Sequence, residues 1–178
     1  MTTECPIFVG IFDGYSWIRC EGKGSFLTSP LMKAFGDERI SAGETRLVVD
    51  LGACTGMDST FMGTLGGMAT RISARPGGAL QIADSGERNR RSLEDLGLDF
   101  FMEIDPIEAP WRGRVDTIRS VLKPAEQKLP GGRTQRSEHV LEAHQALADA
   151  NAQNANEFSN VIRLLETELE NKLKAQKP

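Results

Sequence analysis

Residues 47–65 read LVVDLGACTGMDSTFMGTL, and they place a strand, a short loop and the start of a helix in immediate succession. The run at 46–51 is short, apolar and rich in valine, which is typical of a strand in the middle of a sheet. From residue 59 to about residue 73 the apolar side chains recur at helical spacing, which predicts an amphipathic helix. Three small residues interrupt its apolar stripe, and we expect them to let the helix lie close to the sheet: Gly63, Gly66 and Gly67. A strand followed directly by a helix is typical of an α/β fold.

The segments on either side of this unit continue the alternation. Upstream, two predicted strands at 6–12 and 15–20 flank Asp13-Gly14, a dipeptide typical of a hairpin turn, and Ser29-Pro30 is expected to open a helix. Downstream, the pattern predicts a strand at 79–83, a helix at 85–96, a strand at 100–104 and a helix at 111–122. Because strand–helix–strand crossovers are right-handed, this order predicts a mixed sheet with helices packed mainly on one face.

Composition divides the chain near residue 122. We expect residues 1–122 to form the domain and the polar segment 123–137, which contains Pro and Gly-Gly, to be a linker. Residues 138–175 contain neither Gly nor Pro and are rich in Ala, Leu and Glu, which predicts one long C-terminal helix. A heptad pattern fits this helix, although Asn151 and Asn154 interrupt the apolar seam. A homodimer through a coiled coil and docking onto the chain's own domain are equal alternatives.

Composition also limits the classes of partner. The 178 residues are 39% hydrophobic and 26% charged, which suits a globular protein with a sizeable core. A net charge of −4 argues against a nucleic-acid partner, because phosphate recognition needs a basic surface. No apolar run approaches the about 20 residues that cross a bilayer, and the first residues lack the features of a secretory signal. We therefore expect a cytoplasmic protein with no membrane partner.

Few residues suit metal, disulfide or cofactor chemistry. The three cysteines, Cys5, Cys20 and Cys54, are widely spaced, and we expect them to be reduced thiols. His139 and His144 are five residues apart and do not align on one helical face, so we expect a solvated pair and no metal site. The predicted domain contains no histidine, which removes the commonest hydrolase arrangements. The glycine-rich segment at 63–67 lacks the lysine of a phosphate-binding loop, and no cofactor is expected.

Asp58, Ser59 and Thr60 stand at the predicted entrance of the helix that begins near residue 59. The N-terminus of a helix carries unpaired N–H groups and a partial positive charge of about half a unit, which together favour an anion. From the residues alone, two interpretations are equally good: an anion or phosphate position, or a simple helix cap formed by Asp58 or Ser59.

The chain resembles the STAS domains of anti-sigma factor antagonists and related bacterial partner-switching regulators. The resemblance covers most of residues 6–105. Its hallmark is a strand ending in Asp50-Leu51, a loop, and then Met57-Asp58-Ser59-Thr60-Phe61-Met62-Gly63 at the start of an apolar helix. Gly77-Gly78 before one strand and Leu96-Gly97-Leu98 before the last predicted strand also match the family's pattern.

The resemblance implies a non-enzymatic regulator with a STAS-like fold. It places the phosphoacceptor at Ser59, with Thr60 as a second and less favoured acceptor. A serine kinase that also acts as the anti-sigma factor is the implied partner, and a serine phosphatase is the implied antagonist. The residues implied to contact the partner are Asp58, Thr60, Phe61, Met62 and Ser25.

Two positions depart from the family's pattern. Phe61 stands where the common motif has glycine, and either a buried helix residue or an exposed anchor for a partner accounts for it. Ser25 stands where many members have aspartate. The alternative function is a scaffold or adaptor that does not switch, assembled through the domain and the C-terminal helix, in which Ser59 only caps the helix.

Overall fold

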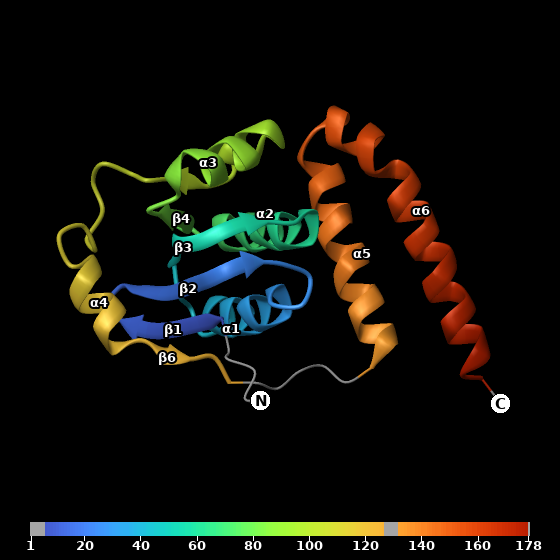
Figure 1. The fold of residues 1–178 in the computed structure, drawn as a ribbon, viewed down its shortest axis with the longest axis horizontal. Coiled ribbons are helices and arrows are strands. Elements are labelled where there is room, and N and C mark those ends of the chain that lie inside the picture. The colour runs from blue at the N-terminus through green and yellow to red at the C-terminus, as the bar shows by residue number, and fades with distance from the viewer. Residues whose placement is uncertain (1–5, 127–131, 178) are drawn as a thin grey trace.

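A computed structural model describes residues 6–126 and 132–177 of the chain (Figure 1). The strands are β1 (Ile7–Phe12), β2 (Tyr15–Gly24), β3 (Arg46–Met57), β4 (Ala79–Ala83), β5 (Glu103–Ile104) and β6 (Lys123–Pro124). The helices are α1 (Ser29–Ser41), α2 (Ser59–Ser73), α3 (Gly86–Asp95), α4 (Val115–Val121), α5 (Arg133–Ala150) and α6 (Ala152–Ala175), with a 3-10 turn η1 (Leu98–Phe100).

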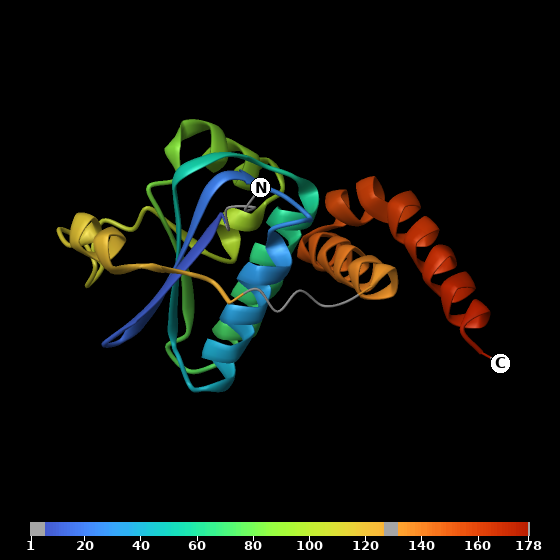
Figure 2. The same ribbon diagram turned by 60° about the horizontal axis from the view of Figure 1, so that its bottom comes forward.

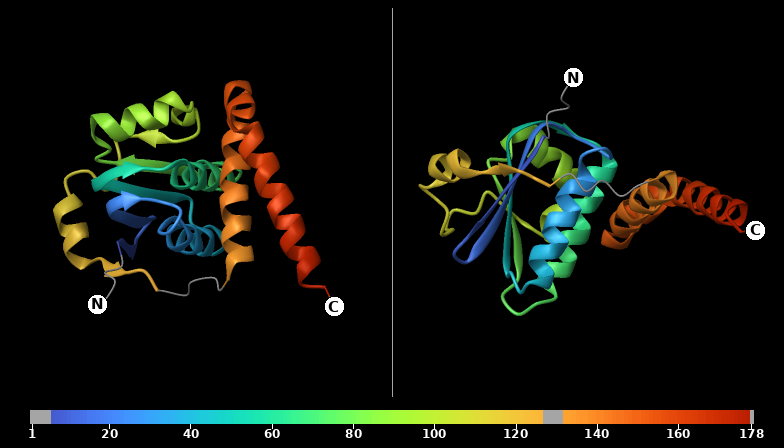
Figure 3. Two further views of the ribbon diagram at one scale, coloured as in Figure 1. Left: turned by 45° about the vertical axis from the view of Figure 1, so that its right-hand side comes forward. Right: turned by 90° about the horizontal axis from the view of Figure 1, so that it is seen from below.

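One mixed sheet with the strand order β5-β4-β3-β2-β1-β6 organises the domain. The strands β2, β3, β4 and β5 pair in parallel, whereas β1 pairs antiparallel with both β2 and β6. Alternate residues of β3 face opposite sides: Leu47 and Val49 join the larger core beneath α1, α2 and α3, and Val48 joins a smaller core with Trp17 and Trp111. Figures 2 and 3 show α1 and α2 on one face of the sheet and α4 on the other. The predicted mixed sheet with helices mainly on one face is confirmed.

The observed elements differ from the predicted ones at a few boundaries. The predicted loop after residue 51 continues as a strand, because β3 pairs with β2 as far as Met57. The strand predicted at 100–104 is reduced to β5, since η1 takes up Leu98–Phe100 and the ring of Phe100 is 87% exposed. The last helix of the domain, α4, begins at Val115, downstream of the buried Trp111.

The C-terminal tail forms a helical hairpin where the sequence predicts a single helix. The chain is extended at Asn151 (φ −164°, ψ 165°), which separates α5 from α6. The Asn151 side chain caps α6 by accepting a hydrogen bond from the Asn154 N–H at 2.8 Å. The side-chain amides of both asparagines donate to the carbonyl oxygen of Leu96 at the end of α3, at 3.1 and 2.8 Å. The two polar residues of the predicted seam therefore fix the hairpin to the domain.

The hairpin packs against the helical layer of its own domain. Figures 1 and 3 show α5 across the ends of α1 and α2, with α6 outermost. Of the predicted linker at 123–137, residues 123–124 form β6 and residues 133–137 belong to α5, whereas residues 127–131 lie outside the described residues. Cys20 and Cys54 are free thiols, and Cys5 also lies outside the described part of the chain.

Candidate functional site

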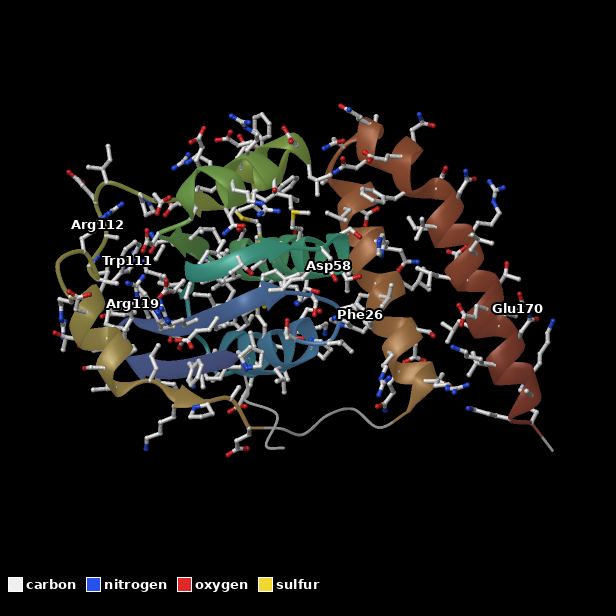
Figure 4. All side chains as sticks on the ribbon, viewed as in Figure 1. Phe26, Asp58, Trp111, Arg112, Arg119 and Glu170 are labelled. Atoms are coloured by element: carbon white, nitrogen blue, oxygen red, sulfur yellow. The ribbon has the colours of Figure 1, made fainter. Side chains whose placement is uncertain are left out.

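Asp58 joins two loops at the N-terminus of α2. Its Oδ1 accepts a hydrogen bond from the backbone N–H of Phe61 at 2.8 Å, which makes Asp58 the N-cap of the helix. Its Oδ2 accepts from the backbone N–H of Phe26 at 2.8 Å, and its own N–H donates to the carbonyl oxygen of Gly24 at 2.9 Å. One carboxylate thus fixes both the helix entrance and the turn that follows β2. Figure 4 shows Asp58 and Phe26 at the end of the domain that faces α5.

Ser59 is the first residue of α2, and its half-buried side chain meets a histidine of α5. The Ser59 Oγ lies 3.0 Å from the Nε2 of His144. The Nδ1 of the same ring lies 2.7 Å from the carbonyl oxygen of Val140. Because a carbonyl oxygen only accepts, Nδ1 carries the proton in the neutral ring, and Nε2 then accepts from the Ser59 hydroxyl. The ring also packs edge-on against Phe158 of α6, with 5.5 Å between ring centres.

A second serine–histidine pair lies beside the first. The Oγ of Ser29, the first residue of α1, lies 2.7 Å from the Nε2 of His139, and both side chains are buried. Burial and the nearby charge of Lys33 lower the pKa of His139. The expectation that His139 and His144 form a solvated pair is wrong, because α5 turns both rings toward the starts of α1 and α2.

The backbone of α5 approaches α2 as closely as a glycine allows. A Cβ atom added at Gly63 would overlap the carbonyl oxygen of Ala143, so a side chain at this position is incompatible with docked α5. Farther along, Gly67 faces Ala146 of α5, and Gly66 faces Leu98. The glycines of α2 therefore accommodate α5 and η1, whereas the sequence suggested that they serve contact with the sheet.

The other residues implied to contact a partner differ in exposure. Thr60 is 4% exposed and Phe61 is fully buried, its ring lying against Gly24 of β2. Phe61 is therefore a buried helix residue and not an exposed anchor for a partner, which were the two alternatives. Met62 is half-buried against the core. Ser25 starts the turn before α1, with its N–H donating to the Oγ1 of Thr28 at 3.0 Å.

Four further residues of this site were not identified from the sequence. Phe26 and Leu27 are 46% and 58% exposed, and they form an apolar tip on the turn held by Asp58. Two large apolar residues between Ser25 and Thr28, within a polar turn, were a usable sequence signal. His139 and His144 gave no comparable signal, since 110 and 85 residues separate them from their serine partners.

A hydroxyl bonded to an oriented imidazole resembles the start of a hydrolase site, but the Nδ1 of this ring meets the carbonyl oxygen of Val140 where a catalytic triad has a carboxylate. Two pockets lie between α2 and α5 farther along the helices: one of about 30 Å³, lined by Gly63, His139 and Ala143, and one of about 330 Å³, lined by Gly66, Leu98 and Ala150. Neither is lined by Ser59 or His144. Within residues 6–126 and 132–177, no group of three or more His, Cys, Asp or Glu side chains could hold a metal ion. In the same part of the chain, no helix is long and apolar enough to span a membrane.

Comparisons with known proteins agree with the fold of the domain. A family model described as the STAS domain matches residues 10–109. No curated protein matches the chain. The NMR structure of TM1081, a Thermotoga maritima protein, is similar at 19% identity and a TM-score of 0.51, over 67% of this chain and 91% of that one.

Two other similar structures are anti-sigma factor antagonists. Unphosphorylated SpoIIAA has 16% identity and a TM-score of 0.49, over 65% of this chain and 99% of its own. The Mycobacterium paratuberculosis antagonist has 21% identity and a TM-score of 0.49, over 65% and 92%. The likeness to TM1081, with a TM-score of 0.51 at 19% identity, indicates a shared fold and nothing finer. The match to the family model ends at residue 109, before α5 and α6 begin.

Proposed function

The chain belongs to the STAS domain family, and from this premise we propose that it is a non-enzymatic regulator similar to the anti-sigma factor antagonists. It binds a serine kinase that is also an anti-sigma factor, and phosphorylation of Ser59 controls this binding. A serine phosphatase reverses the modification. The observation that supports the proposal best is the position of Ser59, the first residue of α2, directly after an N-cap that is tied to the neighbouring turn.

The chemistry of a helix start favours a switch that acts locally. A phosphoryl group adds about −1.5 to −2 charges and three acceptor oxygens. The free N–H groups of the first turn of α2 stabilise that charge, whereas the adjacent carboxylate of Asp58 opposes it. These effects partly cancel within the domain, so the fold is retained. A partner that binds the unmodified hydroxyl meets a bulky dianion after phosphorylation, and the pair dissociates by repulsion and overlap.

The proposed contact surface surrounds the turn after β2 and the first turn of α2. Phe26 and Leu27 supply exposed apolar contacts beside Asp58, which suits the apolar anchors of protein interfaces. Ser25 directly precedes this tip in the chain, and Met62 lies half-buried in the first turn of α2. Thr60 and Phe61 are buried, so they support this surface by packing beneath it and do not contact the partner directly.

Phosphorylation in vitro tests the proposal. The full chain is incubated to completion with Mg-ATP and the anti-sigma-factor serine kinase of the same genome, and the modified peptide is identified by mass spectrometry. We expect phosphate on Ser59, none on the Ser59→Ala variant, and unchanged modification of Thr60→Val. Ser29 is an internal control, because it also starts a helix and meets a histidine but is fully buried.

The same experiment distinguishes the switch from a scaffold. The switch predicts that Ser59→Asp weakens binding to the kinase by about tenfold or more in a calorimetric titration. If Ser59 accepts no phosphate and Ser59→Asp leaves that affinity unchanged, the switch is refuted, and an adaptor with a serine at its helix start is the better description.

A further inference from the structure

The tail covers the first turn of α2, which is part of the surface that the proposed function assigns to a partner, while Phe26 and Leu27 stay exposed. Helix α5 lies over the first turns of α1 and α2, and each of its two imidazoles meets a serine that begins one of these helices. The ion pair between Lys33 and Glu142, 3.9 Å apart, lies at the same contact. This covering comes from residues 133–150, outside the region that matches the family model.

The contact half-buries the Ser59 side chain and occupies its hydroxyl group. The Nε2 of His144 lies 3.0 Å from the Ser59 Oγ. The phosphorus atom of a phosphoryl donor has to come to about the same distance, roughly 3–3.5 Å, from this oxygen. His144 is held in place by the carbonyl oxygen of Val140 on one side and the ring of Phe158 on another. A kinase therefore reaches this oxygen only after α5 has moved.

The close backbone packing between α2 and α5 means that a small shift of α5 does not uncover Ser59. Between Gly63 and Ala143 there is no space for even a methyl group, and Leu147 is fully buried in the core shared with the domain. The connection between α5 and α6 is held by the amides of Asn151 and Asn154 on the carbonyl of Leu96. The hairpin thus departs as a unit or stays in place.

From these contacts we infer that the α5–α6 hairpin is an intramolecular cap on Ser59: docked α5 excludes the kinase, and a phosphoryl group on Ser59 excludes docked α5. The inference rests on the proposed function, because it takes Ser59 as the phosphoacceptor. Four added heavy atoms cannot fit between two atoms that lie 3.0 Å apart, whatever the protonation of the imidazole. Because linkage is reciprocal at equilibrium, release of α5 favours the phosphorylated state of Ser59, and phosphorylation favours release of α5. A larger open population also presents Ser59 to the kinase more often, which raises the rate of phosphorylation.

The first test opens the cap from the α5 side and leaves the domain surface unchanged. The Leu147→Glu variant places a carboxylate at a fully buried position of α5, and Gln145→Glu adds the same charge at an exposed position of that helix. The kinase of the same genome phosphorylates each full-length protein with Mg-ATP in single-turnover reactions. We expect Leu147→Glu to accept phosphate at Ser59 about tenfold faster than wild type, and Gln145→Glu to stay within about twofold.

The second test needs no kinase and measures docking by amide hydrogen exchange. Ser59→Glu introduces charge and bulk, whereas Ser59→Ala removes only the hydrogen bond to His144. We expect residues 139–147 to exchange about tenfold faster in Ser59→Glu than in Ser59→Ala, with β3 unchanged. Gly63→Ala provides a second way to open the cap if Leu147→Glu fails to fold. Its control is Gly67→Ala, where the added Cβ meets only side-chain atoms, the guanidinium end of Arg71 at 3.2 Å and the Cβ of Ala146 at 3.8 Å.

The outcomes separate the cap from the switch. Equal phosphorylation rates in wild type and in a variant with opened α5 overturn the cap and leave the Ser59 switch standing. Equal exchange in Ser59→Glu and Ser59→Ala also overturns the cap. If none of the proteins accepts phosphate, the proposed function fails, and the cap, which needs a phosphoacceptor to protect, fails with it.

Discussion

The most fully buried charge of the domain is the carboxylate of Asp50, and its removal gives the sharpest test of the structure. Asp50 lies on the face of β3 that α4 covers and has no solvent exposure. Arg119 of α4 donates to both of its oxygens at 2.9 Å, and Arg19 donates to Oδ2 at 2.8 Å. The indole N–H of Trp17 and the backbone N–H of Gly52 complete the set, at 3.3 and 2.9 Å. Figure 4 shows Arg119 beside Trp111 at the end of the domain remote from Asp58.

The expected cost of Asp50→Asn follows from these contacts. An amide of the same shape places a donor opposite a guanidinium and leaves the buried side of Arg119 without its charge partner. Breaking a buried ion pair in this way costs about 3–5 kcal/mol of unfolding free energy. For a chain of this size that corresponds to a fall of about 6–20 °C in melting temperature, measured by circular dichroism.

An exposed carboxylate on the same arginine is the matched control. Asp84 accepts from Arg119 at 3.0 Å, but its side chain is 62% exposed. Exposed ion pairs contribute at most about 1 kcal/mol, and asparagine tolerates the left-handed backbone of this position (φ 54°). We therefore expect Asp84→Asn to lower the melting temperature by less than about 4 °C. If Asp50→Asn costs no more than Asp84→Asn, the assignment of Asp50 as the anchor of α4 is refuted.

The pH dependence gives an independent check on Asp50. Burial raises the pKa of this carboxyl group, but the hydrogen bonds from Arg119, from the Gly52 N–H and from Arg19 outweigh it and hold the pKa below its ordinary value. A lowered folded-state pKa adds stability above the ordinary pKa, and this stability is lost as the pH falls through the lowered value. The stability difference between wild type and Asp50→Asn should be full at pH 7 and shrink below about pH 4.

Three further substitutions test other parts of the structure. Phe61→Ala removes a fully buried ring that lies against Gly24, and we expect urea denaturation to report a loss of about 3–5 kcal/mol; a loss under about 1 kcal/mol would contradict burial. Asn154→Ala leaves the carbonyl of Leu96 with one donor fewer, so hydrogen exchange should rise in α5 and α6 while β3 keeps its protection; uniform destabilisation of the domain would argue against a separate hairpin. Phe26→Ser removes an exposed apolar side chain, so stability should change by less than about 0.5 kcal/mol while binding of the anti-sigma-factor kinase weakens at least about fivefold; unchanged binding removes the turn after β2 from the proposed interface.

The sequence predicts most of the domain because its signals are local. Asp13-Gly14 forms the expected turn, with Gly14 at φ 86°, and Gly97 ends α3 at φ 70°. The apolar pattern after Asp58 gives α2 its observed start at Ser59. The prediction fails at 100–104, where an apolar run is not a buried strand: the 3-10 turn exposes Phe100, and two residues are enough to complete the sheet edge.

The sequence left docking of the tail onto its own domain and a homodimer as equal alternatives, because the contacts that decide between them join residues far apart in the sequence. His139 and His144 have an ordinary helical context, and their roles come from serines 110 and 85 residues away. In the sequence of the tail alone, Asn151 and Asn154 only interrupt the heptad pattern. In the structure, both side-chain amides donate to the carbonyl oxygen of Leu96, which gives the two polar residues their role. A pattern analysis of one segment cannot identify a partner that another segment supplies.

The glycines of α2 connect the cap to the stability of the switch itself. Each glycine inside a helix costs about 1 kcal/mol relative to alanine, and α2 contains Gly63, Gly66 and Gly67 within two turns. A helix with this composition depends on tertiary packing for its order, and docked α5 supplies that packing on the side facing away from the sheet. Release of α5 therefore uncovers Ser59 and at the same time removes support from the helix turn that presents it. Gly63 and Gly67, which lower the intrinsic stability of α2, are the positions at which the docked α5 approaches it, so the same residues make room for the cap and make α2 depend on it.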